Sequence, residues 1–203
     1  MRLLFVVQRY GREVAGGAEL HCREFATRLA QRGHDVEVLT SRAQSYVDWA
    51  DVYPGGTAEL DGVTVHRLSV AAPRHDRSFN LLNARVPWGS FPVPLHLQEH
   101  WIRSSGPLLT DLRPWLAQEA GSFDVAVFFS YLYYPTWAGL PVAAGLTATV
   151  LHPTAHEEPS LSLPLFQTTF RHASALAFSS GEEKALVRRH FRVPRRSRVI
   201  GIG

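Results

Sequence analysis

Cysteine and lysine are almost missing from this chain of 203 residues. Cys22 is its one cysteine, Lys184 is its one lysine, and every other basic residue is an arginine. A single cysteine excludes an internal disulfide and is typical of proteins from a reducing compartment. Cys22 falls on the apolar face of an expected helix, so we interpret it as a small core residue rather than as a catalytic thiol.

Long hydrophobic runs are missing as well. No apolar stretch approaches the about 20 residues that a membrane-spanning helix needs. The apolar run at residues 3–7 is too short for a secretory signal and leads directly into a fold element. A hydrophobic content of 45% with 19% charged residues is typical of a globular protein rather than of a disordered one. We therefore expect one globular domain in the cytoplasm.

Positive charge is concentrated near the C-terminal end, although the net charge is only +3. A solvated helix face and loop is the simplest interpretation, and contact with the inner face of a membrane remains open. Only Phe191 is interleaved with the basic residues, so we expect no nucleic-acid partner. The cluster consists of Arg188, Arg189, Arg192, Arg195, Arg196 and Arg198.

Apolar strand patterns alternate with amphipathic helix patterns along the chain. This alternation predicts an α/β fold with a doubly wound, mostly parallel, Rossmann-like sheet in a single domain, residues 1–203. Strands are expected at residues 3–7, 36–39, 63–68, 125–129, 147–151, 175–179 and 199–202. Helices are expected at residues 18–30, 95–120 with breaks near Gly106-Pro107 and Pro114, 134–144, 160–172 and 181–191.

Two stretches, residues 41–61 and 71–94, interrupt the alternation. Both contain prolines and aromatic residues and are expected to be irregular loops. Their aromatic side chains either line a groove for an acceptor molecule or anchor the loops to the body of the domain.

A pair of glycines, Gly16 and Gly17, separates the first expected strand from the first expected helix. The start of a helix presents free N–H groups and the positive end of the helix dipole, so this turn predicts a phosphate site. The alternative is a tight turn that needs a positive φ. The sequence lacks both G-x-G-x-x-G and the P-loop pattern. The function of a nicotinamide-dependent oxidoreductase therefore ranks only third among the functions that the sequence suggests.

Ligands of open parallel sheets bind at the carboxyl ends of the strands. This rule predicts that the glycine pair, residues 152–159 and residues 179–183 lie in one region. Within it, His156 is the candidate acid–base residue, because histidine is the side chain whose charge changes nearest neutral pH. His152 and His156 would converge on zinc only in a helix, which the neighbouring prolines oppose, so no metal ion is expected. Ser180 and Glu183 have the spacing of a capping box.

Three segments in order resemble the N-terminal domain of GT-B glycosyltransferases, family 4 in particular. The resemblance implies two Rossmann-like domains that face a cleft, with the N-terminal domain on the acceptor side. The C-terminal domain, which binds the nucleotide-sugar donor, is then absent from this chain. The segments are AGGAELH…LAQRGHDVEVLT at residues 15–40, LHPTAHEEPSLSL at residues 151–163, and ALAFSSGEEKALVRRHF at residues 175–191, followed by RVIGIG at residues 198–203.

The resemblance also implies roles for individual residues. His156 occupies the family's "H-E" or "H-D" position near the reacting carbon of the sugar, and Gly16 and Gly17 approach the donor diphosphate. Tyr10, Arg74, Glu157 and Glu158 are candidate acceptor contacts. Surface exposure is the default interpretation of Tyr10 and Arg74, and at least one of the two glutamates is expected to be merely solvated.

The implied activity is retaining transfer of a hexosyl group from a nucleotide-sugar to a hydroxyl acceptor. The acceptor is a sugar, a lipid-linked molecule or another small molecule, and no cofactor beyond the nucleotide-sugar co-substrate is expected. The isolated domain is expected to be inactive. The alternative function is a stand-alone, non-catalytic module that binds a carbohydrate or a phosphorylated ligand.

Overall fold

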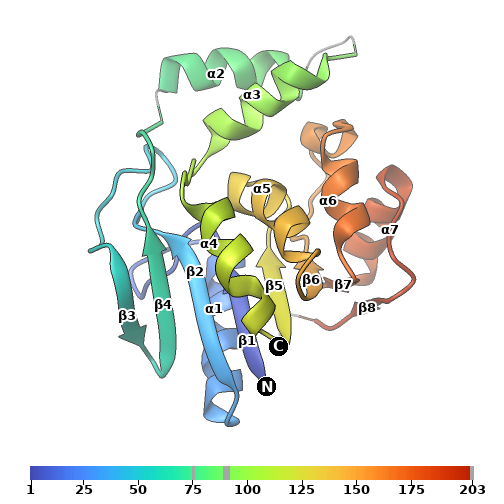
Figure 1. Cartoon of the computed structure of the whole chain (residues 1–203). Helices are drawn as coiled ribbons and strands as arrows, with labels where there is room; N and C mark the ends of the chain where they lie inside the picture. The colour runs from blue at the N-terminus through green and yellow to red at the C-terminus, as the bar shows by residue number, and fades with distance from the viewer. Residues whose placement is uncertain (75, 89–91, 202–203) are drawn as a thin grey trace.

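The computed structural model describes residues 1–74, 76–88 and 92–201, and these residues contain one eight-stranded sheet (Figure 1). The strand order is β3-β4-β2-β1-β5-β6-β7-β8. Only the β3–β4 pair is antiparallel, and each of the other neighbouring pairs is parallel. The predicted α/β, doubly wound, mostly parallel Rossmann-like fold is confirmed.

The bounds of most elements lie close to the expected ones. The strands are β1 (Arg2–Val6), β2 (Asp35–Ser41), β3 (Gly56–Leu60), β4 (Val63–Leu68), β5 (Val125–Phe129), β6 (Ala148–His152), β7 (Ala175–Phe178) and β8 (Ser197–Val199). The α-helices are α1 (Gly17–Gln31), α2 (Asp76–Arg85), α3 (Leu95–Ser105), α4 (Leu112–Glu119), α5 (Tyr134–Ala143), α6 (Phe166–His172) and α7 (Gly181–His190). Two short 3₁₀ helices are η1 (Ala120–Ser122) and η2 (Pro159–Ser162).

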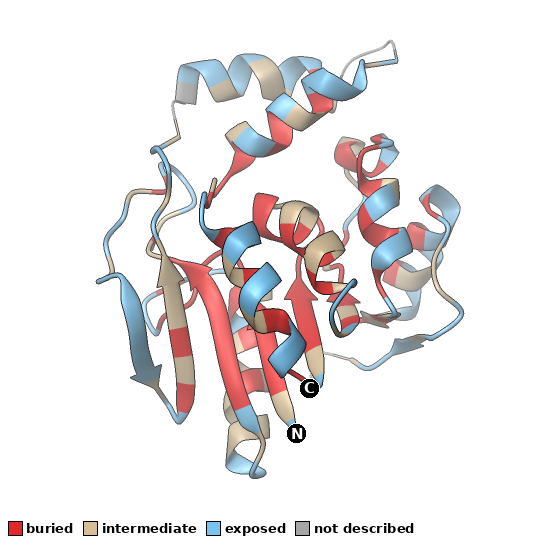
Figure 2. Cartoon of the chain, in the orientation of Figure 1, coloured by how far each residue is buried: buried red, intermediate tan, exposed pale blue. Residues whose placement is uncertain are grey.

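The two faces of the sheet support separate hydrophobic cores, because successive side chains of each strand point to opposite faces. On β1, Phe5 packs with Cys22 and Ala26 of α1 in the smaller core. Leu4 and Val6 belong to the larger core, which includes apolar residues of α3 to α7. The strands of the sheet centre are therefore buried on both sides (Figure 2). Burial of Cys22 raises the pKa of its thiol well above the ordinary value, which agrees with its interpretation as a core residue.

Three expectations about elements were wrong. Residues 41–61 are not one exposed loop, because they include the edge strand β3 and the fully buried Trp49, whose indole N–H donates to the Ser105 carbonyl. Residues 71–94 are not irregular throughout, because they include α2. The expected helix at residues 160–172 is divided into η2 and α6, since Pro164 has no N–H to continue a helix.

Of the two breaks expected within residues 95–120, the one near Gly106-Pro107 is present, whereas the helix restarts at Leu112 and continues through Pro114. Helix α3 ends before Gly106-Pro107, and α4 has Pro114 in its first turn, where the missing N–H costs no hydrogen bond. The last strand begins two residues before the expected start and ends at Val199. Residues 202 and 203 of the RVIGIG segment lie outside the described residues.

Candidate functional site

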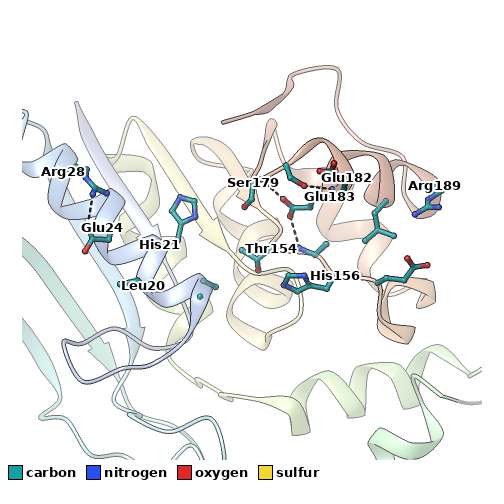
Figure 3. Close-up of a pocket in the computed structure, with 16 residues that line it drawn as sticks. Leu20, His21, Glu24, Arg28, Thr154, His156, Ser179, Glu182, Glu183 and Arg189 are labelled. Atoms are coloured by element: carbon teal, nitrogen blue, oxygen red, sulfur yellow. Dashed lines mark hydrogen bonds and ion pairs between the residues drawn. The ribbon is translucent and has the colours of Figure 1, made fainter. Parts of the chain in front are cut away.

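Helix α1, the loop after β6 and the segment from the end of β7 into α7 border a cavity of about 780 Å³ at the carboxyl edge of the sheet. Helix α1 contributes Gly17, Leu20 and His21 to one wall, and α7 forms the opposite wall (Figure 3). The loop at residues 154–157 lies between them. The structure therefore brings together three of the segments that the sequence placed in one region.

The two glycines differ in their surroundings. A Cβ on Gly16 would collide with the Glu19 carboxylate and would lie 3.1 Å from Nη2 of Arg9. A Cβ on Gly17 would meet no atom within 4 Å, and Gly17 lines the cavity. Helix α1 has no side-chain cap at its N-terminus, so its first N–H groups remain available to a ligand. The fold itself requires Gly16, whereas Gly17 leaves open space beside the start of the helix.

A buried ion pair lies directly behind the glycine turn. Nε of Arg9 donates to Oε1 of Glu19 at 2.9 Å, and both side chains are about 95% buried. The same guanidinium donates to the carbonyl oxygens of Ala15, at 2.9 Å, and Gln44, at 3.0 Å. Arg9 thus fixes the end of β1, the glycine turn and the loop after β2 relative to one another. The sequence gave no indication of this role of Arg9.

His156 is exposed and lines the cavity, on a loop that is fastened to α7. The Ala155 N–H donates to Oε1 of Glu183 at 2.9 Å, and the Ser179 N–H donates to Oε2 of the same carboxylate at 2.6 Å. The Glu183 N–H in turn donates to Oγ of Ser180 at 3.1 Å. One arm of the expected capping box is therefore present. The Glu183 carboxylate positions the residue next to His156 as well as the start of the helix.

The two glutamates after His156 have different surroundings. Glu157 is exposed and lines the cavity. Glu158 accepts a hydrogen bond of 2.7 Å from the hydroxyl of the buried Tyr131, which also contacts Ser160 at 2.9 Å. Burial and the Glu158 carboxylate raise the pKa of Tyr131 above its ordinary value. Glu158 thus anchors the loop, and Glu157 is the glutamate that a ligand in the cavity can reach.

Tyr10 and Arg74 do not line this cavity. Tyr10 is 1% exposed and belongs to the core beneath α1, where burial raises the pKa of its hydroxyl. Arg74 lines a second cavity, with Nε donating to the Val47 carbonyl at 2.9 Å. The structure therefore brings His156, Glu157 and Gly17 together and places Tyr10 and Arg74 elsewhere.

The model of the glycosyl transferase 4-like domain matches residues 16–203. The chain belongs to this family. The resemblance noted in the sequence is thereby confirmed. No curated protein sequence matches the chain.

Two solved structures are similar to this glycosyltransferase domain. Sucrose-phosphate synthase from Thermosynechococcus elongatus has 13% identity and a TM-score of 0.60, with 100% of this chain and 90% of that chain covered. The E. coli structure titled trehalose-6-phosphate, bound with UDP-2-fluoro glucose, has 15% identity and a TM-score of 0.46. That comparison covers 93% of this chain and 42% of the other. At these identities the first structure shows a shared fold, which agrees with the family assignment.

A second histidine, His152, is buried behind the cavity of the glycosyltransferase domain. It is 1% exposed, and its ring stacks on Phe129 with centroids 5.4 Å apart and faces His21 at 4.6 Å. Within the described part of the chain, neither ring nitrogen has a hydrogen-bond partner. Burial and the neighbouring His21 lower the pKa of His152 to about 4. Its ring is therefore neutral near pH 7 and serves as a packing element.

The low pKa of His152 predicts a loss of stability in mild acid. Between pH 6.5 and about 4 the unfolded chain binds a proton at this residue and the folded chain does not. The free energy of unfolding should therefore fall by about 3 kcal/mol as the pH decreases through this range. Burial lowers the pKa of His21 as well, so this residue adds to the same trend. Urea unfolding at a series of pH values measures the effect. His152→Phe should flatten the dependence, and an unchanged slope in that variant would contradict this assignment.

The described ranges contain no group of three or more His, Cys, Asp or Glu side chains that could hold a metal ion. Residues 153–156 are not helical, so His152 and His156 do not have the helical arrangement that a shared zinc ion would need. Independence of metal ions stays a prediction.

Proposed function

We propose that this chain is the acceptor-side domain of a retaining glycosyltransferase that moves a hexosyl group from a nucleotide-sugar to a hydroxyl. The observation that supports the proposal most is the cavity itself. It combines the uncapped N-terminus of α1 at Gly17 with the accessible imidazole of His156. An anion is stabilised at the first site, and a proton is accepted at the second.

Each end of the cavity has a part in this reaction. Transfer breaks the bond between the anomeric carbon and the diphosphate and forms a bond from that carbon to the acceptor oxygen. The departing diphosphate is negatively charged, and the N–H groups beside Gly17 stabilise that charge. His156 orients the acceptor hydroxyl and accepts its proton, while Glu157 is placed to bind a neighbouring hydroxyl. No metal ion or cofactor is needed for these steps.

The binding partners of this domain follow from the roles of the two ends of the cavity. The donor is shared with a second, nucleotide-sugar-binding domain that faces this cavity, and the acceptor is a sugar, a lipid-linked molecule or another small hydroxyl compound. We place the reaction in the cytoplasm, at the inner face of the membrane. All six arginines of the C-terminal cluster are exposed, as such a peripheral contact requires. None of the helices in the described residues has the length and apolarity to cross a membrane.

The chain should show no transfer by itself, because the proposed second domain supplies most contacts to the donor. The test is an assay of this chain with a panel of nucleotide-sugars and simple sugar acceptors, together with calorimetric titration of each donor. We expect no turnover and weak donor binding. Robust turnover would refute the assignment as one half of a site. Tight binding of a carbohydrate without turnover in a two-domain protein would favour the non-catalytic binding module.

A further inference from the structure

A second cavity, of about 460 Å³, lies beneath α2 and α3. Its walls include the segment before α2, the inner side of α2, the last turn of α3 and Trp49. It shares no lining residue with the cavity that contains His156. Its volume is within the range of small-molecule sites, about 300–1,000 Å³. The transfer chemistry proposed above makes no use of this cavity.

Two arginines line this second cavity. Arg74 and Arg103 lie beside His100, and none of the lining residues in the described part of the chain is acidic. Arg103 is exposed, and its guanidinium carbon lies 5.9 Å from the centre of the Trp137 ring. Within the described residues its guanidinium makes neither an ion pair nor a hydrogen bond. A guanidinium binds phosphate through a planar pair of N–H groups. The lining therefore favours an anion with several oxygen acceptors.

The position of Arg74 is fixed by its surroundings. Nε donates to the Val47 carbonyl at 2.9 Å, and the backbone N–H donates to the Asp48 carbonyl at 2.6 Å. The guanidinium carbon lies 4.4 Å from the centre of the Phe79 ring and 5.9 Å from that of Trp49. Such stacking holds a guanidinium in one orientation before a ligand arrives. The two rings also provide an apolar wall beside the positive charge.

We propose that this cavity binds a phosphate ester of a small polyol or sugar, with the phosphate toward Arg103 and the carbon skeleton against Phe79 and Trp49. This binding goes beyond the proposed function, because the cavity is separate from the one that contains His156. It does not depend on glycosyl transfer and can be measured without it. The phosphate is carried either by a free ester or by the headgroup of a lipid.

The test is an NMR titration of this chain with glycerol 3-phosphate. Trp49 is the reporter, because its indole N–H donates to the Ser105 carbonyl at 2.7 Å beside the cavity. The indole resonance should shift with glycerol 3-phosphate and not with glycerol. Arg103→Gln should weaken binding about tenfold, as expected for one lost charge-assisted hydrogen bond. Arg77→Gln is the matched control, because Arg77 is exposed on α2 and does not line the cavity.

Vesicles of phosphatidylcholine, with and without phosphatidylglycerol, separate the two sources of phosphate. Vesicle binding that requires both phosphatidylglycerol and Arg103 supports a lipid headgroup. Binding of glycerol 3-phosphate without vesicle binding supports a free ester. The proposal is overturned if neither probe moves the Trp49 resonance, or if Arg103→Gln and Arg77→Gln bind both probes equally well. Neither variant removes a core side chain, so a failure to fold should not obscure the result. A loss of phosphate binding would leave the assay of donor transfer as a separate test.

Discussion

Replacing Arg9 with methionine should lower the free energy of unfolding by about 3–5 kcal/mol. The substitution leaves the Glu19 carboxylate buried without its cation, and it removes the donors to the Ala15 and Gln44 carbonyls. An uncompensated buried charge is expensive because it loses its hydration and gains no partner. Urea unfolding of the two proteins, followed by circular dichroism, measures the difference.

Arg28→Met is the matched control for this prediction. Arg28 pairs with Glu24 on the same helix, at 3.1 Å, but the two side chains are 61% and 47% exposed. An exposed pair of this spacing contributes only about 0.3–0.5 kcal/mol. The double variant Arg9→Met/Glu19→Met should recover part of the stability lost by Arg9→Met, because it removes the orphaned charge. Equal effects of Arg9→Met and Arg28→Met would show that the buried pair has no special importance.

Replacing His156 with alanine should reduce the rate of glycosyl transfer by about 10²–10⁴-fold, the usual contribution of a positioned acid–base group. The measurement requires the enzyme in which this domain is joined to a donor-binding domain. His156 is exposed, so the variant should fold like the parent and its thermal unfolding should be unchanged.

His190→Ala is a suitable comparison, because His190 is exposed on α7 and does not line the cavity. The proposal predicts that this control keeps the parental rate of transfer. A His156→Ala enzyme with the parental rate would remove His156 from the reaction, although it would not change the family assignment.

Strands with buried apolar residues could be predicted from the sequence, and the exposed edge strand β3 could not. The bounds of β4 and β5 agree with the expected residues 63–68 and 125–129. Val63 and Val65 of β4 and the last four residues of β5 are buried, so both strands have apolar residues that a sequence pattern can detect. Residues 56–59 of β3 are exposed and have no apolar alternation. The usable signal was the Asp61-Gly62 turn, where both residues have a positive φ, as two-residue hairpins prefer.

The candidate site, too, could be predicted from the sequence only in part. Sequence position was sufficient to place Gly17 and His156 at one edge of the sheet, because the carboxyl ends of parallel strands must meet there. It was not sufficient to pair Glu183 with Ala155, which lie 28 residues apart. Nor did it indicate that His152 packs against His21. Such contacts are selected by the three-dimensional packing of side chains, which no local pattern contains.

The shared carboxylate of Glu183 links the position of α7 to that of the loop that contains His156. One end of the helix is tied to the backbone beside His156, and the other leads through residues 191–196 into β8. Because the Ala155 N–H and the Ser179 N–H share this carboxylate, a displacement of the first turn of α7 would also displace the backbone next to His156.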